Sequence, residues 1–450
     1  MGNIEKQVLE KITPTHEYRE EVEQIVEEIR VILEKETEKR KLPVTVELVG
    51  SIAKDTYLQN NMDIDFFICF PTNYDKEEIA NQALQIGKTF LKDTEESYAE
   101  HPYLRGYYED LYVEVVPCYK IEDAKQKLSA VDRTPLHTKF VKENITEDQK
   151  QEVRLFKQFL KGINCYGAEA QIQGFSGYLC EIILLKYGTF QNILKNAKEW
   201  KHGEKLTLSK GSFPDFDTPL VFIDPVDSDR NVASALSEEK FDLFIRACKE
   251  YLDKSASTFF FPNPVKPWSL EKISKILDKQ DCRYIGVKFQ TPEIIDENLY
   301  PQVRKTVRSV WETLERYDFK VFDATYFLDK KSVYIIVKTQ KEQLSETMIH
   351  TGPPIRKQEN SEKFLKKWEN NPLVVKGPYK ENNRWYVEIK REYKEASIFL
   401  KKEFKKLSLG KHIDRSVKEK YNILNQEDLI KEELKTFWTS YLDGKMPWER

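Results

Sequence analysis

Two aspartates, Asp63 and Asp65, flank a single isoleucine at the start of the apolar segment DIDFFICF, residues 63–70. Because alternate residues of a strand point to the same side, both carboxylates share one face while Ile64 and Phe66 point into a core. Neighbouring carboxylates on a buried strand are costly unless basic side chains or a divalent cation neutralise them. The pattern therefore indicates a cation site or, as the plainer alternative, an exposed face of a sheet.

Two further features favour the cation site. Glu114 lies in the apolar segment DLYVEVVPCY, residues 110–119, which we predict as a second strand. If the two strands are neighbours, three carboxylates converge, and such oxygen ligands suit one or two Mg²⁺ ions. The pair Gly50-Ser51 ends a predicted strand and begins a helix, where backbone N–H groups and a hydroxyl can bind a triphosphate. The chemistry indicated is a magnesium-assisted reaction of a nucleotide.

The elements that must position these groups occupy about the first 145 residues, and their order is α/β. A helical module follows from about residue 147, with Ser237 as a predicted N-cap, and ends at the Pro-rich segment 259–268. Beyond it, the order strand, helix, hairpin resembles a split βαβ or RRM-like sandwich. Periodicity predicts helices over 15–40, 76–93, 147–164, 175–200, 237–254, 297–318, 361–369 and 394–407, strands over 42–50, 63–70, 110–119 and 282–289, and hairpins over 320–339 and 372–393.

Composition limits the classes of function. The chain has 450 residues, of which 33% are charged and 40% hydrophobic, and a net charge of −3. A polyanion would therefore have to be bound by local patches. Basic stretches at 302–311, 363–368 and 384–415 are candidates for phosphate contacts, although such runs are commonly solvated surface.

The cysteines and apolar runs indicate the compartment. Six scattered cysteines show no CxxC spacing and no metal-like pairing with histidine, so we predict reduced thiols, no zinc and a cytoplasmic location. The apolar runs are too short to span a membrane and the first residues are no signal peptide, so we expect no membrane partner.

The whole pattern of Gly-Ser, an eleven-residue gap, Asp-apolar-Asp and a later strand carboxylate resembles the DNA polymerase β nucleotidyltransferase superfamily. Longer collinear segments resemble the archaeal (class I) CCA-adding enzymes, which are tRNA nucleotidyltransferases. The resemblance covers almost the whole chain and is strongest over 45–260. Its segments are GSIAKDTYL, HPYLRGYY, VEVVPCYKI, SAVDRTPLHTKFV, EVRLFKQFLKGINCYGAE, GFSGYLCEIILLKYG, DPVDSDRNVASALS and GPPIRK.

The resemblance implies an α+β multidomain fold. Its parts would be a polymerase β-like α/β head over 1–145, a helical neck over 146–258 that recognises the nucleotide base, and an α+β, RRM- or ferredoxin-like body and tail over 259–450 that binds tRNA, with the tail at roughly 283–350. The implied activity is template-independent addition of C, C and A to tRNA that lacks all or part of its 3′ CCA. CTP and ATP would be the substrates, Mg²⁺ the cofactor and a homodimer the assembly.

The resemblance also implies roles for single residues. Asp63, Asp65 and Glu114 would hold two metal ions, which activate the tRNA 3′-hydroxyl and neutralise the leaving pyrophosphate. Arg230 would read the incoming base. The implied nucleotide-binding residues around the triphosphate are Gly50, Ser51, Lys54, Thr134, His137, Lys157 and Tyr166.

Two positions depart from the family pattern. Glu114 stands where aspartate is usual, which moves the carboxylate, and Lys54 stands where arginine also occurs, which keeps the charge but loses the planar fork. Other readings stay open. Arg230 could simply form a salt bridge to the acidic loop DPVDSD, and His137 could be an ordinary polar residue. The whole chain could be a catalytically silent tRNA-binding protein, or a poly(A) polymerase-like or oligoadenylate synthetase-like nucleotidyltransferase.

Overall fold

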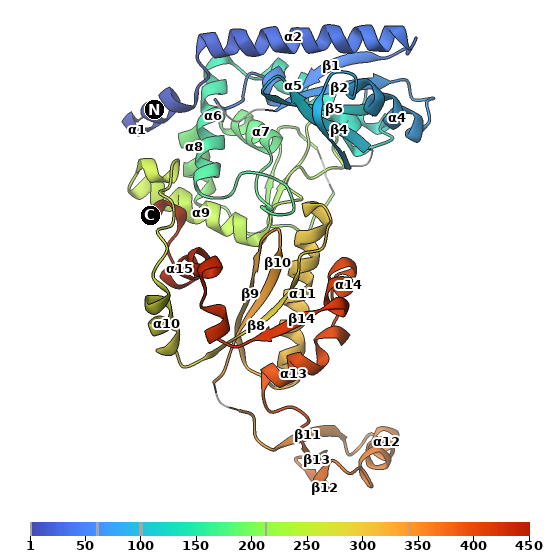
Figure 1. The fold of residues 1–450 in the computed structure, drawn as a ribbon, viewed down its shortest axis with the longest axis vertical. Helices are drawn as coiled ribbons and strands as arrows, with labels where there is room; N and C mark the ends of the chain where they lie inside the picture. Colours follow the sequence, from blue (N-terminus) through green and yellow to red (C-terminus); the bar gives the residue numbers. More distant parts are fainter. Residues whose placement is uncertain (1, 60–62, 99–101, 212–213, 342) are drawn as a thin grey trace. The chain divides into compact units, whose positions relative to one another are not determined.

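The structure is a computed structural model that describes residues 2–59, 63–98, 102–211, 214–341 and 343–450 (Figure 1). The chain forms two compact units: residues 1–264 with 445–450, and residues 265–444. The passage from the first unit to the second lies inside the Pro-rich segment 259–268. The finer division into head, neck, body and tail stays a prediction.

A five-stranded sheet in the first unit has the order β1-β2-β5-β4-β3. Ile64, Phe66 and Ile68 of β2 point to the face covered by the helices α2 and α4, as strand alternation predicts. The predicted helix 76–93 ends early, at Gly87, because residues 92–98 form a strand that pairs with β4. The elements are β1 (Thr45–Val49), β2 (Ile64–Phe70), β3 (Lys92–Tyr98), β4 (Pro102–Tyr108), β5 (Leu111–Tyr119), α2 (His16–Lys39), α3 (Gly50–Ala53) and α4 (Lys76–Gly87).

The rest of the first unit is mainly helical, as the periodicity from residue 147 predicts. The Ser237 side chain accepts a hydrogen bond from the backbone N–H of Lys240, which confirms the predicted N-cap. The predicted segment 175–200 forms two helices, because the chain turns at Gly188 with a φ of 80°. The elements are α1 (Asn3–Ile12), α5 (Thr134–Asn144), α6 (Glu147–Gly162), α7 (Gly177–Tyr187), α8 (Phe190–Ala197), α9 (Glu238–Asp253) and the short parallel strands β6 (Glu204–Leu206) and β7 (Leu220–Phe222).

Residues 445–450 pack with the first unit although they follow the whole second unit in sequence. The Trp448 ring stacks on Phe259 with centroids 5.1 Å apart, and its indole N–H donates to Glu250 at 2.6 Å. Thr258 donates to the Trp448 carbonyl at 2.7 Å. The first unit is therefore built from two separated pieces of sequence.

The second unit contains an antiparallel sheet of order β14-β8-β10-β9, with helices on both faces. The predicted strand 282–289 and hairpin 320–339 are confirmed, whereas β14 lacks a clear alternation and was not predicted. The elements are β8 (Arg283–Gln290), β9 (Val321–Leu328), β10 (Ser332–Thr339), β14 (Tyr421–Leu424), and the helices α10 (Leu270–Asp278), α11 (Asp296–Arg316), α13 (Ala396–Glu403), α14 (Lys411–Glu419) and α15 (Lys435–Asp443).

A smaller antiparallel sheet in the same unit has the order β11-β13-β12 and carries one helix, α12. The predicted hairpin 372–393 is confirmed as β12 and β13, whose turn places Asn382 and Asn383 at positive φ. The elements are β11 (Thr347–Pro354), α12 (Gln358–Trp368), β12 (Val374–Glu381) and β13 (Arg384–Lys390).

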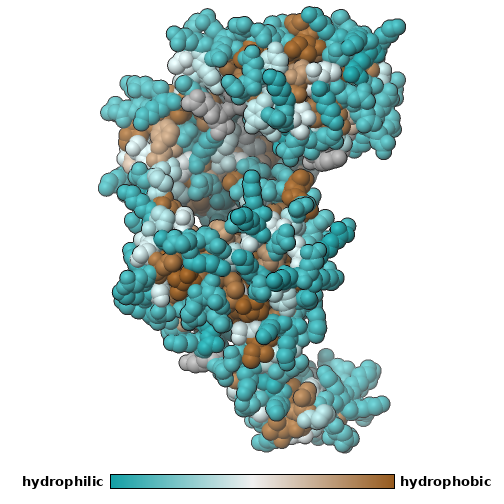
Figure 2. Space-filling view, in the orientation of Figure 1, coloured by the Kyte–Doolittle hydropathy of each residue, from teal (hydrophilic) through white to brown (hydrophobic). Residues whose placement is uncertain are grey.

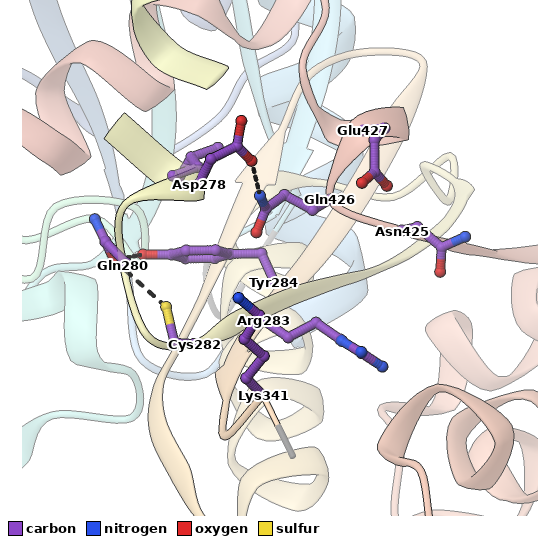
Figure 3. Close-up of a pocket in the computed structure, with 10 residues that line it drawn as sticks. Asp278, Gln280, Cys282, Arg283, Tyr284, Lys341, Asn425, Gln426 and Glu427 are labelled. Atoms are coloured by element: carbon purple, nitrogen blue, oxygen red, sulfur yellow. Dashed lines mark hydrogen bonds between the residues drawn. The ribbon is translucent and has the colours of Figure 1, made fainter. Parts of the chain in front are cut away.

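A cavity of about 420 Å³ lies in the second unit, between the start of β8 and residues 425–427 (Figure 3). Its lining groups bond to one another: the Gln426 amide donates to Asp278 at 2.9 Å, and the Tyr284 hydroxyl donates to Gln280 at 2.9 Å. The cavity is lined by residues of the second unit, whereas all of the nucleotide- and metal-binding residues implied by the sequence belong to the first unit.

Candidate active site

Strand pairing brings two of the predicted carboxylates together. β2 runs parallel to β5, with Asp65 opposite Glu114 and Ile64 opposite Val113. The sequence-based condition that the two strands are neighbours is thus met. Asp63 is exposed immediately before β2, on the same side as Asp65 by strand alternation.

The three carboxylates destabilise one another's charge. Burial raises the pKa of Asp65 well above its usual range, and the charges of Glu114 and Asp63 add to the rise. Burial is likewise the main cause of the raised pKa of Glu114, and partial desolvation of the otherwise exposed Asp63 raises its pKa as well. A positive charge placed among them would relieve this repulsion.

Arg105 on β4 supplies part of that positive charge, a partner that the sequence did not predict. It is the register neighbour of Glu114, and its Nε lies 2.8 Å from Glu114 Oε1. Its guanidinium also lies 5.0 Å from the centre of the Tyr103 ring. The carboxylate that departs from the family pattern is therefore ion-paired to an arginine of the neighbouring strand.

Carboxylate oxygens are suitable ligands for a hard cation such as Mg²⁺. The carboxylates of this site do not, however, form a complete set of metal ligands. Within the described part of the chain, neither Asp63 nor Asp65 forms an ion pair, although the charges of Arg105 and Lys161 act on Asp63 and those of Lys54 and Arg105 act on Asp65. The described residues contain no group of three or more His, Cys, Asp or Glu side chains arranged to hold one metal ion. The role of Glu114 as the third ligand stays a prediction, because Arg105 holds its carboxylate.

The Gly50-Ser51 turn lies directly against Asp65. Gly50 has a φ of +74°, and a Cβ at this position would lie 2.0 Å from Asp65 Oδ2. Glycine is therefore required both for the backbone conformation and for the close approach. The turn ends β1 and begins α3, as predicted, but this helix is a single turn of Gly50–Ala53.

Lys54 and Lys157, both predicted to bind triphosphate, meet at one buried carboxylate. Glu181 on α7 lies 2.6 Å from the Lys54 ammonium and 3.1 Å from that of Lys157. The Thr56 hydroxyl donates to Glu181 Oε1 at 2.6 Å and accepts from Lys157 at 3.0 Å. Burial alone would raise the pKa of Glu181, but the two lysines outweigh it and lower the pKa to about 2.

Sequence reasoning missed Glu181, although a signal for it exists. The segment GYLCEIILLKY is apolar on nearly all sides, and Glu181 is the one carboxylate within it. A buried acid in such a helix requires a cationic partner, which periodicity alone cannot identify. The buried cluster of Lys54, Lys157 and Glu181 carries one net positive charge, because two lysines share one acid.

His137 and Arg230 also meet at a single carboxylate, that of Asp224. His137 Nε2 and Arg230 Nη1 each lie 2.8 Å from Asp224 Oδ2. The Tyr178 hydroxyl donates to Asp224 Oδ1 at 3.1 Å, and its ring stacks on His137 with centroids 4.0 Å apart. The simpler reading of Arg230, a salt bridge to the acidic loop, describes its contact correctly, and sequence reasoning missed the part played by Asp224 and Tyr178.

Thr134 and Tyr166 lie on segments that adjoin these clusters. Thr134 begins α5 and is three residues from His137 on the same helix. Tyr166 is half-buried beside Lys161, whose ammonium lies 5.5 Å from the centre of its ring. Burial raises the pKa of Tyr166, and the charges of Glu181 and Asp63 add to it.

Lys54 connects the groups electrostatically. Its charge lowers the pKa of Asp65 against the larger effect of burial, and it also acts on the buried His137. The predicted residues thus form three adjoining sets: the carboxylates of the neighbouring strands β2 and β5 with Asp63, the two lysines on Glu181, and the His137–Arg230 pair on Asp224. Basic side chains that can bind an anion, beside acidic groups that attract a cation, are the arrangement expected for metal-assisted phosphoryl chemistry.

Comparison with protein families identifies three consecutive regions of the chain. Residues 26–137 match a family described as nucleotidyltransferase domain. Residues 151–261 match tRNA nucleotidyltransferase, second domain, and residues 282–426 match CCA-adding enzyme, C-terminal domain. The matches therefore cover both units.

Similar proteins have been described in several archaea. The chain is 35% identical to a CCA-adding enzyme of Methanosarcina acetivorans, over 94% of both chains. It is 36% identical to that of Archaeoglobus fulgidus, over 90% of this chain and 93% of that protein. A solved structure of E. coli MS115-1 CdnC with ATP has a TM-score of 0.44 at 16% identity, over 57% of this chain and 93% of the other. On the similarity of sequence along nearly its whole length, the chain belongs to the family of CCA-adding enzymes.

Proposed function

We propose that this chain adds C, C and A to the 3′ end of tRNA that lacks all or part of its CCA, using CTP and ATP. The observation that carries the proposal is the pairing of Asp65 with Glu114 across β2 and β5, in a chain that aligns with CCA-adding enzymes over 94% of its length. In each step the 3′-hydroxyl oxygen of the tRNA forms a bond to the α-phosphorus. The bond from that phosphorus to the β-phosphate breaks, and pyrophosphate leaves.

Asp63, Asp65 and Glu114 are the residues proposed to hold Mg²⁺. The bound metal would make the 3′-hydroxyl easier to deprotonate and would neutralise charge on the leaving pyrophosphate. The mutual repulsion of these carboxylates supports the proposal, because it makes this part of the sheet attractive to a cation. To bind the metal ion, the Glu114 carboxylate has to break its ion pair with Arg105 or to contact Arg105 and the metal at the same time.

The triphosphate is proposed to lie against the net positive charge of Lys54 and Lys157, with Gly50, Ser51, Thr134, His137 and Tyr166 as further contacts. Glu181 keeps the two ammonium groups together, so their charge is fixed in place before the substrate binds. Arg230 is proposed to read the base, because its guanidinium can donate several hydrogen bonds in one plane.

The second unit is proposed to bind tRNA through its basic stretches. Figure 2 shows hydrophilic residues over most of the visible face of both units. Assembly as a homodimer and a cytoplasmic location stay predictions. Among the described residues, no helix is both long and apolar enough to cross a membrane.

Incubation of a tRNA transcript that ends before CCA, with Mg²⁺ and chosen nucleotides, tests the proposal. We expect two additions with CTP alone and three with CTP and ATP together, read on a sequencing gel. A long adenosine tract with ATP alone would instead indicate a poly(A) polymerase-like enzyme. Binding of the transcript without extension under any condition would indicate a silent tRNA-binding protein.

A further inference from the structure

We infer that Asp224 is a positioning residue that orients the base-reading Arg230 and the triphosphate-side His137 together, and thereby determines which nucleotide is accepted. The inference rests on the proposed function, because the role of Arg230 in base recognition belongs to that proposal. The loop DPVDSDR contains three aspartates, and its sequence does not distinguish Asp224 from the other two. The contacts of Asp224 with His137 and Arg230 do distinguish it.

The backbone around Asp224 is fixed at both ends of its loop. Asp224 follows β7, and its N–H donates to the Arg230 carbonyl at 3.0 Å. Directly outside this pair, Ile223 and Asn231 form an antiparallel bridge. The Asn231 side chain accepts from the backbone N–H of Phe222 at 2.9 Å. Asp224 and Arg230 are therefore held opposite each other where the loop begins and ends.

The Asp224 carboxylate is completely occupied by donors and fully buried. Oδ1 accepts from the Tyr178 hydroxyl and from the backbone N–H of Val226, both at 3.1 Å. Oδ2 faces His137 Nε2 and Arg230 Nη1, both at 2.8 Å. An ionised carboxylate accepts about four hydrogen bonds, so these partners use its capacity and fix its orientation.

Two consequences follow for the residues that would contact the nucleotide. Arg230 uses one terminal nitrogen on Asp224, which sets the plane of its guanidinium while the side chain stays 31% exposed. Its other donors then have a defined direction from which to meet the edge of a base. The carboxylate also requires His137 to carry its proton on Nε2, which leaves Nδ1 as an acceptor.

The same loop provides a matched control. Asp227 is ion-paired to Arg133 at 2.8 Å and to Lys127 at 3.0 Å, so it ties the loop to its surroundings without touching Arg230 or His137 by its side chain. Loss of either aspartate should loosen the loop. Loss of Asp224 should also free the two residues that face the nucleotide.

The experiment compares Asp224→Asn with Asp227→Asn. A neutral amide offers one accepting oxygen and two N–H donors, so it cannot accept from His137, Arg230 and Tyr178 together. For Asp224→Asn we expect the ratio of kcat/KM for CTP over UTP to fall by about tenfold or more, the scale of one arginine–base contact. We expect unchanged tRNA affinity, and we expect Asp227→Asn to keep the wild-type ratio.

A second readout is independent of turnover. In ¹⁵N-resolved spectra, wild-type His137 should show a proton on Nε2, and Asp224→Asn should show a mixture of tautomers.

If Asp224→Asn does not fold, Tyr178→Phe, which removes one donor from the same carboxylate, should lower the CTP preference by about threefold. Equal discrimination in wild type, Asp224→Asn and Tyr178→Phe would overturn the inference. Failure of the wild type to extend tRNA would overturn the proposed function instead, and the His137 spectra would still test the geometry.

Discussion

At the scale of single residues, Asp65 has the most strongly raised pKa of the three carboxylates in the site. Burial and two neighbouring carboxylates raise its pKa by more than the charges of Lys54 and Arg105 lower it. Such an arrangement costs stability in the absence of a cation. Its presence in the fold is understandable if the group acts on a metal-bound nucleotide, which is the role that we propose.

Asp65→Asn tests that role. The change keeps the shape of the side chain but removes the charge, so we expect the rate of CMP addition to fall by at least about a hundredfold. Binding of tRNA without Mg²⁺ should stay within about twofold, because phosphate contacts are proposed elsewhere. Asp110→Asn, at an exposed position, is the control. Retained addition by Asp65→Asn would remove this residue from the proposed metal site.

Glu181 gives a prediction about stability. Glu181→Gln leaves Lys54 and Lys157 buried without their counter-charge, so we expect the free energy of unfolding at neutral pH to fall by about 3–5 kcal/mol. Urea denaturation measures this, with the exposed Glu143→Gln as control. A loss no larger than that of the control would mean that the lysines do not depend on Glu181.

Glu181 also predicts how the free energy of unfolding depends on pH in acidic solution. Because the folded-state pKa of Glu181 is lowered to about 2 from its ordinary value of 4.5, its contribution to stability is present above about pH 4.5 and is lost as the pH falls toward 2. Unfolding measured between these values should therefore depend less steeply on pH in Glu181→Gln than in wild type. Parallel curves would contradict the assigned ion pairs.

At the scale of elements, the turn between β1 and α3 sets the position of Asp65. Gly50→Ala would place a Cβ 2.0 Å from Asp65 Oδ2 and would force alanine to a φ of +74°. We expect a loss of about 1–2 kcal/mol from the backbone alone, with a further loss from the clash. Gly203→Ala, at a φ of +83° with no atom within 4 Å of the added Cβ, isolates the backbone cost.

The two glycine variants should differ in activity as well as in stability. Nucleotide addition should fall in Gly50→Ala, because the carboxylate has to move, and should be unaffected in Gly203→Ala. Denaturation and single-addition rates measure the two effects separately. Equal effects of both variants would show that the contact with Asp65 is unimportant.

Local sequence patterns predict the helices and strands of the site well, but they do not predict which distant side chains pair with its charged residues. Alternation around Asp65 located β2, and the apolar run around Glu114 located β5, so the pair of carboxylates was predictable. The partners Glu181 and Asp224 were not, because they lie 127 and 87 residues from Lys54 and His137. Periodicity reports which face of an element is buried, but not which distant side chain completes a buried charge.

At the scale of the whole molecule, the net charge of −3 requires tRNA binding to rely on selected surfaces. Lys401 and Lys402 are exposed neighbours on α13, within the basic stretch 384–415. Changing both to glutamate should weaken tRNA binding and reduce the salt dependence of affinity, since fewer counterions are released. Filter binding at several salt concentrations measures both quantities.

The control for this surface changes Lys275 and Lys279, two exposed lysines in and after α10 that lie outside the basic stretches. If both double variants weaken binding equally, the effect is one of overall charge. If neither does, the lysines of α13 are ordinary solvated surface.

The packing of Trp448 on Phe259 has a consequence for biosynthesis. A ribosome makes the chain in order, so the segment that covers Phe259 emerges only after the 180 residues of 265–444 have been made. Until then the Phe259 ring lacks this stacking partner, so part of the aromatic surface of the nascent first unit stays uncovered. The packing of the first unit is therefore completed only after the second unit has been translated.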